Sequence, residues 1–169
     1  MLSSGIEAGG HGHSLAPPLS TLIPAIVEAL PNNEAPPLIG AGGVSEGAHV
    51  ASILTLGASG VCVGTRFLLS PESWYSDKQK QALINAKSTV RTMAFDLVRG
   101  TVGWPMGVDG RCLYNNTVQD FDSGVNLEEV KEKYSTDDPD RMLVWAGTGV
   151  ALMTVIKPAK VFLWQAWTT

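Results

Sequence analysis

The sequence predicts an α/β protein built on parallel strands, and three observations indicate this class. Short apolar runs alternate with segments of helical periodicity through the first half of the chain. Glycines follow these runs before the next helix-like segment begins, the order expected where crossover helices join parallel strands. The chain has 169 residues, the size of one domain. Two architectures remain open at this point, an open doubly wound sheet and a (β/α)8 barrel.

The first helix is predicted from Leu19 to Leu30, where apolar residues recur at helical spacing and Ser20 is a candidate N-cap. The breaker Pro31-Asn32-Asn33 follows it. A buried strand is expected over residues 37–41, because this apolar run is too short for a helix and lies between proline and glycine.

The same order recurs further along the chain. Ser45 is a candidate N-cap for a second helix, which Gly57 stops. Residues 60–64 are interpreted as another buried strand, with Cys62 inside it. A third helix is predicted from Pro71 to Lys87, since proline suits the first helical turn.

The second half of the chain has a different character. Residues 99–124 are mostly glycine, polar and turn-forming, which predicts a long loop or an excursion with Cys112 in it. A short charged helix is expected over 127–134 behind Asn126. A longer apolar helix, interrupted by glycines, is expected over 139–156.

Composition argues against several classes of partner. The net charge of -4 and the pI near 5.3 argue against nucleic-acid binding, which usually requires a basic patch. No window approaches the ~18 consecutive apolar residues of a membrane span, and no signal segment stands at the N-terminus. The two cysteines offer neither a disulfide framework nor metal-ligand spacing. We therefore expect a soluble, cytoplasmic protein with free thiols and no bound metal.

Two glycine-containing turns follow the predicted strands. Gly40-Ala41-Gly42-Gly43 lies between a strand and a helix, so its amides can point toward a phosphate at the positive end of the helix dipole. Gly64-Thr65-Arg66 repeats the arrangement and adds a hydroxyl and a guanidinium. For either turn taken alone, the glycines are explained equally well by a tight turn and close helix packing as by a phosphate site. The presence of both turns together favours a phosphate site. In (β/α)8 barrels the phosphate site is often formed by the loops after the last two strands. The two turns therefore favour the interpretation that this chain is the C-terminal part of a barrel.

A further glycine-rich segment, Gly5 to Gly12, contains His11. Four of its eight residues are glycine, which lets a backbone approach a ligand closely. An imidazole exposed in such a loop suits proton transfer near neutral pH, although a structural histidine is the alternative. His13 is expected at the surface and His49 on the second helix, away from the strand ends. Three tryptophans are interpreted as packing residues: Trp145, Trp164 and Trp167.

Three segments in this order resemble the motif set of the nitronate monooxygenases, once called 2-nitropropane dioxygenases. They are Gly5-Ile6-Glu7-Ala8-Gly9-Gly10-His11-Gly12, Ile39-Gly40-Ala41-Gly42-Gly43-Val44 and Val63-Gly64-Thr65-Arg66-Phe67. Two later segments, 104–111 and 145–150, are similar to the fungal-type members. The resemblance runs from about residue 4 to about residue 159.

This resemblance implies an FMN-binding (β/α)8 barrel, a flavoprotein that oxidises alkyl nitronates with O2 to a carbonyl compound and nitrite. It implies that His11 is the base that deprotonates a nitroalkane, or a positioning group for a nitronate already ionised. The flavin-dependent enoyl-acyl-carrier-protein reductases are near relatives, but they usually have serine where this chain has Ala8, which favours nitronate oxidation. The cofactor-binding residues implied are Gly9, Gly10, Gly42, Gly43, Gly64 and Thr65.

The length and the motif positions predict an incomplete barrel. A (β/α)8 barrel needs about 250 residues, and the Glu-Ala-Gly-Gly-His motif, which the family places well past the middle of the barrel, comes here at residue 7. Met1 to Ser4 stands where an apolar strand is expected, so three or fewer barrel strands are predicted.

Three segments are expected: a partial barrel with the flavin-phosphate turns (1–97), a loop and helical extension (98–160) and a divergent tail (161–169). The chain is thus expected to be a truncated enzyme, with a non-catalytic barrel fragment as the alternative. The open edge of such a sheet provides a route to self-association.

Overall fold

A computed structural model describes residues 1–30 and 36–168, with side chains as far as residue 163. The predicted breaker at residues 31–33 lies outside the described residues. The side chains of Trp164 and Trp167 lie outside them as well, so their predicted packing role stays a prediction.

Three short parallel strands form the first sheet, in the order β1 (Leu2–Ser4), β3 (Ile39–Ala41) and β4 (Gly60–Cys62). Ala41 is in register with Ser4 on one side and with Cys62 on the other, so the three carboxyl ends are level. The predicted α/β class is confirmed, as are the two predicted strands. β1 corrects the expectation that no strand precedes the histidine motif: backbone pairing with β3 makes residues 2–4 a strand despite their serines.

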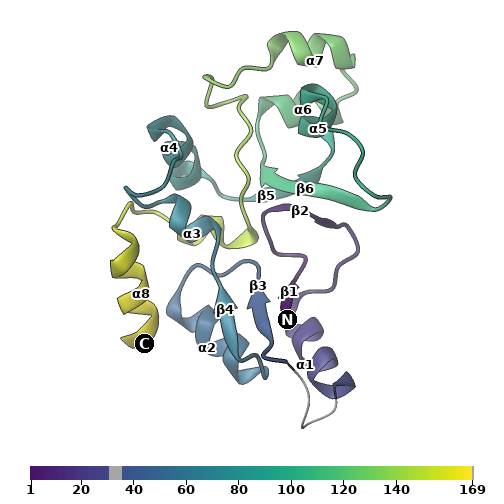
Figure 1. The fold of residues 1–169 in the computed structure, drawn as a ribbon. Coiled ribbons are helices and arrows are strands. Elements are labelled where there is room, and N and C mark those ends of the chain that lie inside the picture. Colours follow the sequence, from purple (N-terminus) through teal and green to yellow (C-terminus); the bar gives the residue numbers. More distant parts are fainter. Residues whose placement is uncertain (31–35, 169) are drawn as a thin grey trace.

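Helices α1 (Leu19–Ala29) and α2 (Gly47–Thr55) connect these strands and pack beside them (Figure 1), so this part of the chain repeats a unit of strand and crossover helix. The core between helices and sheet contains Leu19, Ile23 and Ile53.

Both predicted N-caps of these helices are wrong. Ser20 lies inside α1, and the carboxylate of Glu7 accepts a hydrogen bond from the backbone N–H of Leu19 at 3.1 Å. The N-cap of α2 is Glu46, because the hydroxyl of Ser45 lies against Nδ1 of His49 at 3.1 Å. Neither predicted serine therefore caps its helix.

The second sheet is antiparallel, in the order β2 (Gly10–His13), β6 (Val108–Leu113) and β5 (Thr89–Thr92). The prediction of a long loop over residues 99–124 is therefore wrong. It missed β6 and the helix α6 (Asn116–Asp122), because pairing with strands on both sides holds β6 extended despite its glycine and charged residues. Through β2, the segment containing the predicted site histidine belongs to this sheet (Figure 1).

Helix α5 (Ala94–Arg99) follows β5 and spans the predicted division at residue 97. The second sheet takes strands from both sides of that division. The three-segment division itself stays a prediction.

Cys62 was predicted to be buried and Cys112 to lie in a loop, and both predictions are wrong. Cys62 is the last residue of β4 and is exposed. Cys112 is not in a loop but in β6, where it is fully buried against Phe95 and Val118. The prediction for Cys112 was wrong because the glycine-rich composition of residues 99–124 gave no sign of β6.

One predicted helix differs in extent. Within residues 71–87 the helix is α4 (Asp77–Asn85), which begins at a capping box between Ser76 and Gln79, and a separate short helix, α3 (Thr65–Leu68), precedes this segment. Helix α7 (Leu127–Lys133) confirms the short charged helix, with the Asn126 side chain as its N-cap.

The predicted apolar helix over 139–156 is wrong. The segment is largely extended and ends in a short 3-10 helix, η1 (Thr148–Leu152), before α8 (Ala159–Thr168). Its buried residues alternate. Met142, Val144 and Ala146 face one hydrophobic cluster, and Leu143 and Trp145 face another. Successive side chains thus point to opposite sides, which is the period of two of an extended segment and not the period of a helix.

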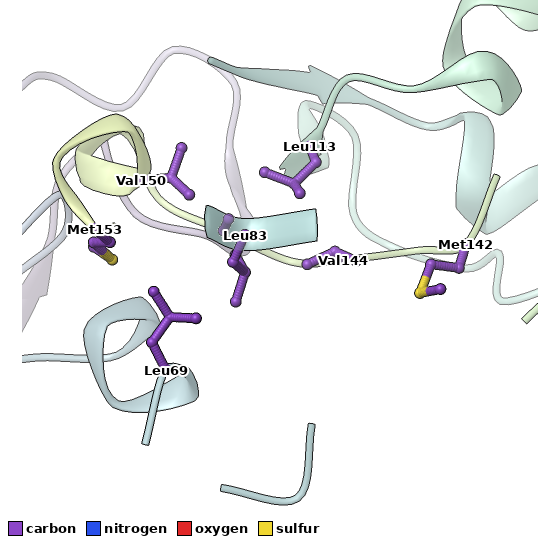
Figure 2. Packing of buried hydrophobic residues seen from close by; sticks show 8 residues of the cluster. Leu69, Leu83, Leu113, Met142, Val144, Val150 and Met153 are labelled. Atoms are coloured by element: carbon purple, nitrogen blue, oxygen red, sulfur yellow. The ribbon is translucent and has the colours of Figure 1, made fainter. Parts of the chain in front are cut away.

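Figure 2 shows the first of these clusters, in which side chains from α4, β6 and the segment leading to η1 converge. Leu83 of α4 lies among them and is fully buried. The cluster attaches the C-terminal segment to the rest of the chain, close to the carboxyl ends of the parallel strands. Within residues 1–30 and 36–168, no helix combines the length and the apolar character needed to cross a membrane.

Candidate functional site

A cavity of about 420 Å³ opens at the carboxyl ends of the three parallel strands. Ser4, Ala41 and Cys62, the last residues of β1, β3 and β4, contribute to its wall. The far wall comes from Trp145, Gly147 and Met153, near the C-terminal end of the chain. All six residues expected to bind the cofactor line it: Gly9, Gly10, Gly42, Gly43, Gly64 and Thr65.

Backbone conformation accounts for three of these glycines. Gly10 has φ of +75°, Gly42 has φ of +127° and Gly43 has φ of +67°, values that residues with a Cβ rarely adopt. A Cβ on Gly43 would also lie 3.0 Å from Cβ of Glu7. For this turn, the tight-turn explanation is therefore sufficient by itself.

Close packing accounts for Gly9. A Cβ on Gly9 would lie 2.6 Å from the carbonyl carbon of Ala146 and 2.7 Å from the backbone nitrogen of Gly147. The N–H of Thr148 donates a hydrogen bond to the carbonyl oxygen of Glu7 at 2.9 Å. The histidine motif and the segment 146–148 are thus in backbone contact.

Gly64 differs from the others, because neither explanation applies to it. Its φ is -105°, and a Cβ there would meet no atom within 4 Å. The hydrogen bonds of the described residues include none donated by the backbone N–H of Gly64 or of Gly43. Two free donors therefore border the cavity, and at Gly64 the space beside the backbone is open.

Thr65 and Arg66 follow Gly64 but point to different places. The hydroxyl of Thr65 accepts a hydrogen bond from the backbone N–H of Gly147 at 2.9 Å and retains its own proton to donate. Arg66 donates to the carbonyl oxygen of Val155 at 3.3 Å, and its guanidinium lies 3.8 Å from the ring centre of Phe162. Burial lowers the pKa of Arg66, with Glu46 opposing the shift. The guanidinium expected at this turn is therefore not part of the cavity wall.

His11 lies in the middle of β2, in register with Gly110 of β6. Its Nε2 is 2.9 Å and 3.0 Å from the two carboxylate oxygens of Asp96. The imidazole stacks on Trp104, with ring centres 3.9 Å apart, and meets the edge of Trp145 at 4.8 Å. Trp145, which the imidazole contacts, and Gly10, the residue before His11, both line the cavity, whereas His11 itself is not among the residues of its wall.

The other histidines lie where the sequence placed them. His13 is exposed, and its Nδ1 accepts a hydrogen bond from the N–H of Leu15 at 3.1 Å. His49 is on α2 and contacts Ser45.

Three residues of the site region were missed. Asp96 is separated from His11 by 85 positions, so no local pattern could have paired them. Trp145 was interpreted as packing only, although it lines the cavity. Tyr75 also lines the cavity, and burial raises the pKa of its phenol, which keeps the hydroxyl protonated.

Comparison with known proteins gives a consistent result. A family model described as nitronate monooxygenase matches residues 1–165. Nitronate monooxygenase npaC of Metarhizium robertsii is 37% identical over 96% of this chain and 49% of its own length. A nitronate monooxygenase of Neurospora crassa is 30% identical over 94% of this chain and 45% of its own length. This chain thus spans about half the length of these relatives.

Solved structures agree on the fold. A nitroalkane oxidase from Streptomyces ansochromogenes superposes with a TM-score of 0.75 at 25% identity, over 98% of this chain and 50% of that one. FabK from Thermotoga maritima superposes with a TM-score of 0.73 at 25% identity, over 98% and 52% of the two chains. The α/β segment is therefore part of the barrel that these proteins share, and the chain belongs to the nitronate monooxygenase family, a family of oxidoreductases.

Proposed function

We propose that this chain supplies the FMN-phosphate site and the proton-transfer histidine of a nitronate monooxygenase that oxidises alkyl nitronates with O2 to a carbonyl compound and nitrite. The observation that carries the proposal is the convergence of all six expected cofactor residues on one cavity at the carboxyl ends of three neighbouring parallel strands. Membership of the family and the likeness to a nitroalkane oxidase support the reaction class.

The residues present fit FMN, and its phosphate in particular. The free N–H groups of Gly43 and Gly64 and the hydroxyl proton of Thr65 are donors that suit a phosphate. The open space at Gly64 allows the phosphate to approach the backbone closely. FMN held there would take up the electrons of the substrate and deliver them to O2.

We assign the proton step to His11. When the substrate is a neutral nitroalkane, the imidazole takes a proton from the carbon beside the nitro group, and the electron pair remains on the substrate as a nitronate. When the substrate is already a nitronate, His11 only positions it. Ala8, where the related reductases have serine, lines the cavity, which supports nitronate oxidation over the reductase alternative.

The test uses the 169-residue chain with FMN. We expect saturable, stoichiometric FMN binding, followed by release of nitrite from an alkyl nitronate under air. Failure to bind FMN would overturn the proposal and favour the alternative of a non-catalytic barrel fragment. Binding without nitrite release would confine the proposal to cofactor binding.

We also propose self-association and a cytoplasmic location. β1 and β4 stand at the two edges of the described parallel sheet, where unpaired backbone groups can pair with a second copy. Light scattering should then give a dimer mass, and a monomer at all concentrations would contradict the proposal. Two free thiols suit the reducing cytoplasm.

A further inference from the structure

Asp96 is a buried carboxylate to which the mechanism above gives no role. It lies in the first turn of α5 and is 1% exposed. Its Oδ1 accepts hydrogen bonds from the hydroxyl of Thr101 at 2.9 Å and from Nε1 of Trp104 at 3.3 Å. Both oxygens lie within 3.0 Å of Nε2 of His11. A buried carboxylate surrounded by donors is suited to accept hydrogen bonds in its ionised form.

This acceptor favours one tautomer of His11. An ionised carboxylate has no proton to donate, so Nε2 must carry the hydrogen of the contact. The neutral imidazole then has its lone pair on Nδ1. The stacked ring of Trp104, inclined by only 15°, and the edge of Trp145 hold the plane of the imidazole.

Other contacts also hold β2 in place. β2 is already paired with β6 over its four residues, and the guanidinium of Arg91 donates to the carbonyl oxygen of Gly12. The nearby carboxylate of Asp109 pairs with Arg91 and not with His11. Among the described residues, the carboxylate that contacts the imidazole is that of Asp96. A buried charge is costly unless it is well paired. For Asp96, part of this pairing is the contact with Nε2 of His11.

We propose that Asp96 is a positioning residue for His11. Its carboxylate fixes the hydrogen on Nε2, so that Nδ1 is the nitrogen that takes the substrate proton, and it stabilises the imidazolium that results. The bond between carbon and hydrogen breaks, a bond between Nδ1 and hydrogen forms, and the electron pair stays on the nitronate. This inference rests on the proposed role of His11, and it requires no oxidant beyond the proposed one.

The first experiment compares Asp96→Asn with the wild-type chain, both loaded with FMN. Asparagine can donate or accept, so it no longer enforces one tautomer. We expect turnover of a neutral nitroalkane to fall about 100-fold, the size of a general-base contribution, and turnover of the preformed nitronate to change little. Asp109→Asn is the matched control, because it removes a paired carboxylate of the neighbouring strand that does not touch His11. An undiminished rate with the neutral nitroalkane in Asp96→Asn would overturn the inference.

The second experiment needs neither FMN nor turnover. Nitrogen-15 chemical shifts of the imidazole, assigned by their loss in His11→Asn, report which ring nitrogen carries the hydrogen. We expect hydrogen on Nε2 in the wild type and a mixed population in Asp96→Asn. Thr101→Val, which removes a donor to Asp96 but retains the carboxylate, is the control and should keep the wild-type tautomer. The wild-type measurement decides the inference even if Asp96→Asn does not fold.

Hydrogen on Nδ1 in the wild type would overturn the inference whatever the activity. A chain that turns over no substrate but shows the expected tautomer would instead contradict the proposed function, while the assignment of the hydrogen to Nε2 by Asp96 would stand.

Discussion

Gly149 packs directly on Gly43: a Cβ on Gly149 would overlap the backbone carbonyl oxygen of Gly43 and would lie 3.1 Å from Cβ of Ser45. Gly149 belongs to η1, and Gly43 follows β3. The 3-10 helix η1 therefore supports the proposed phosphate turn at Gly43 through direct backbone packing.

The first prediction concerns this contact. Gly149→Ala should lower the free energy of unfolding by about 1–3 kcal/mol, the usual cost of overpacking, because the backbone of Gly43 cannot move aside as a flexible side chain could. Urea denaturation measures the change. Gly64→Ala is the control, since its Cβ meets no atom within 4 Å, and its stability should stay within about 0.5 kcal/mol of the wild type. Equal stabilities for the two variants would contradict the packing described.

The second prediction uses the same control variant for binding. Gly64→Ala should weaken FMN binding at least about tenfold, or about 1.4 kcal/mol, because its methyl group occupies the open space beside the free N–H. Riboflavin, which lacks the phosphate, should bind the wild type and the variant alike. Titration followed by flavin fluorescence measures both ligands. An equal loss for riboflavin would place the phosphate elsewhere.

The third prediction separates the two roles of His11. His11→Ala should abolish most turnover of a neutral nitroalkane and retain much of the turnover of the nitronate, because only the first reaction needs a base. Nitrite release with each substrate measures the difference. His13→Ala, an exposed histidine of the same strand, should behave as the wild type. Full turnover of the neutral nitroalkane by His11→Ala would exclude it as the base.

The sequence was informative where structure depends on neighbouring residues. The helix over residues 19–29 and the strands ending at Ala41 and Cys62 follow from local periodicity and punctuation, and all three were predicted. The six expected cofactor residues came together because level carboxyl ends of parallel strands bring their following turns to one place.

Other features depend on partners far along the chain. The run Met142-Leu143-Val144 is apolar at every position, so periodicity could not distinguish a helix from a strand buried on both faces. The contact between His11 and Asp96 likewise depends on β2 joining the second sheet, and β6, its partner there, was concealed by a composition typical of loops.

The fourth prediction concerns the thiol buried in that concealed strand. Burial raises the pKa of Cys112 from 9.0 to about 12. Between about pH 9 and pH 12 the unfolded thiol is therefore ionised while the folded one is protonated, so the folded state binds more protons and its stability falls as the pH rises. Each pH unit in this window should cost up to about 1.4 kcal/mol.

Urea denaturation from pH 8 to pH 11 measures that loss, with Cys112→Ala as the test variant. Truncation of a buried side chain lowers stability at every pH, so the slopes with pH are compared rather than the absolute values. Cys112→Ala should show a shallower decline than the wild type, whereas Cys62→Ala, a control at an exposed cysteine, should keep the full decline. Identical slopes for the wild type and Cys112→Ala would contradict the prediction. They would mean that Cys112 ionises as readily in the folded chain as in the unfolded one, despite its burial in β6 against Phe95.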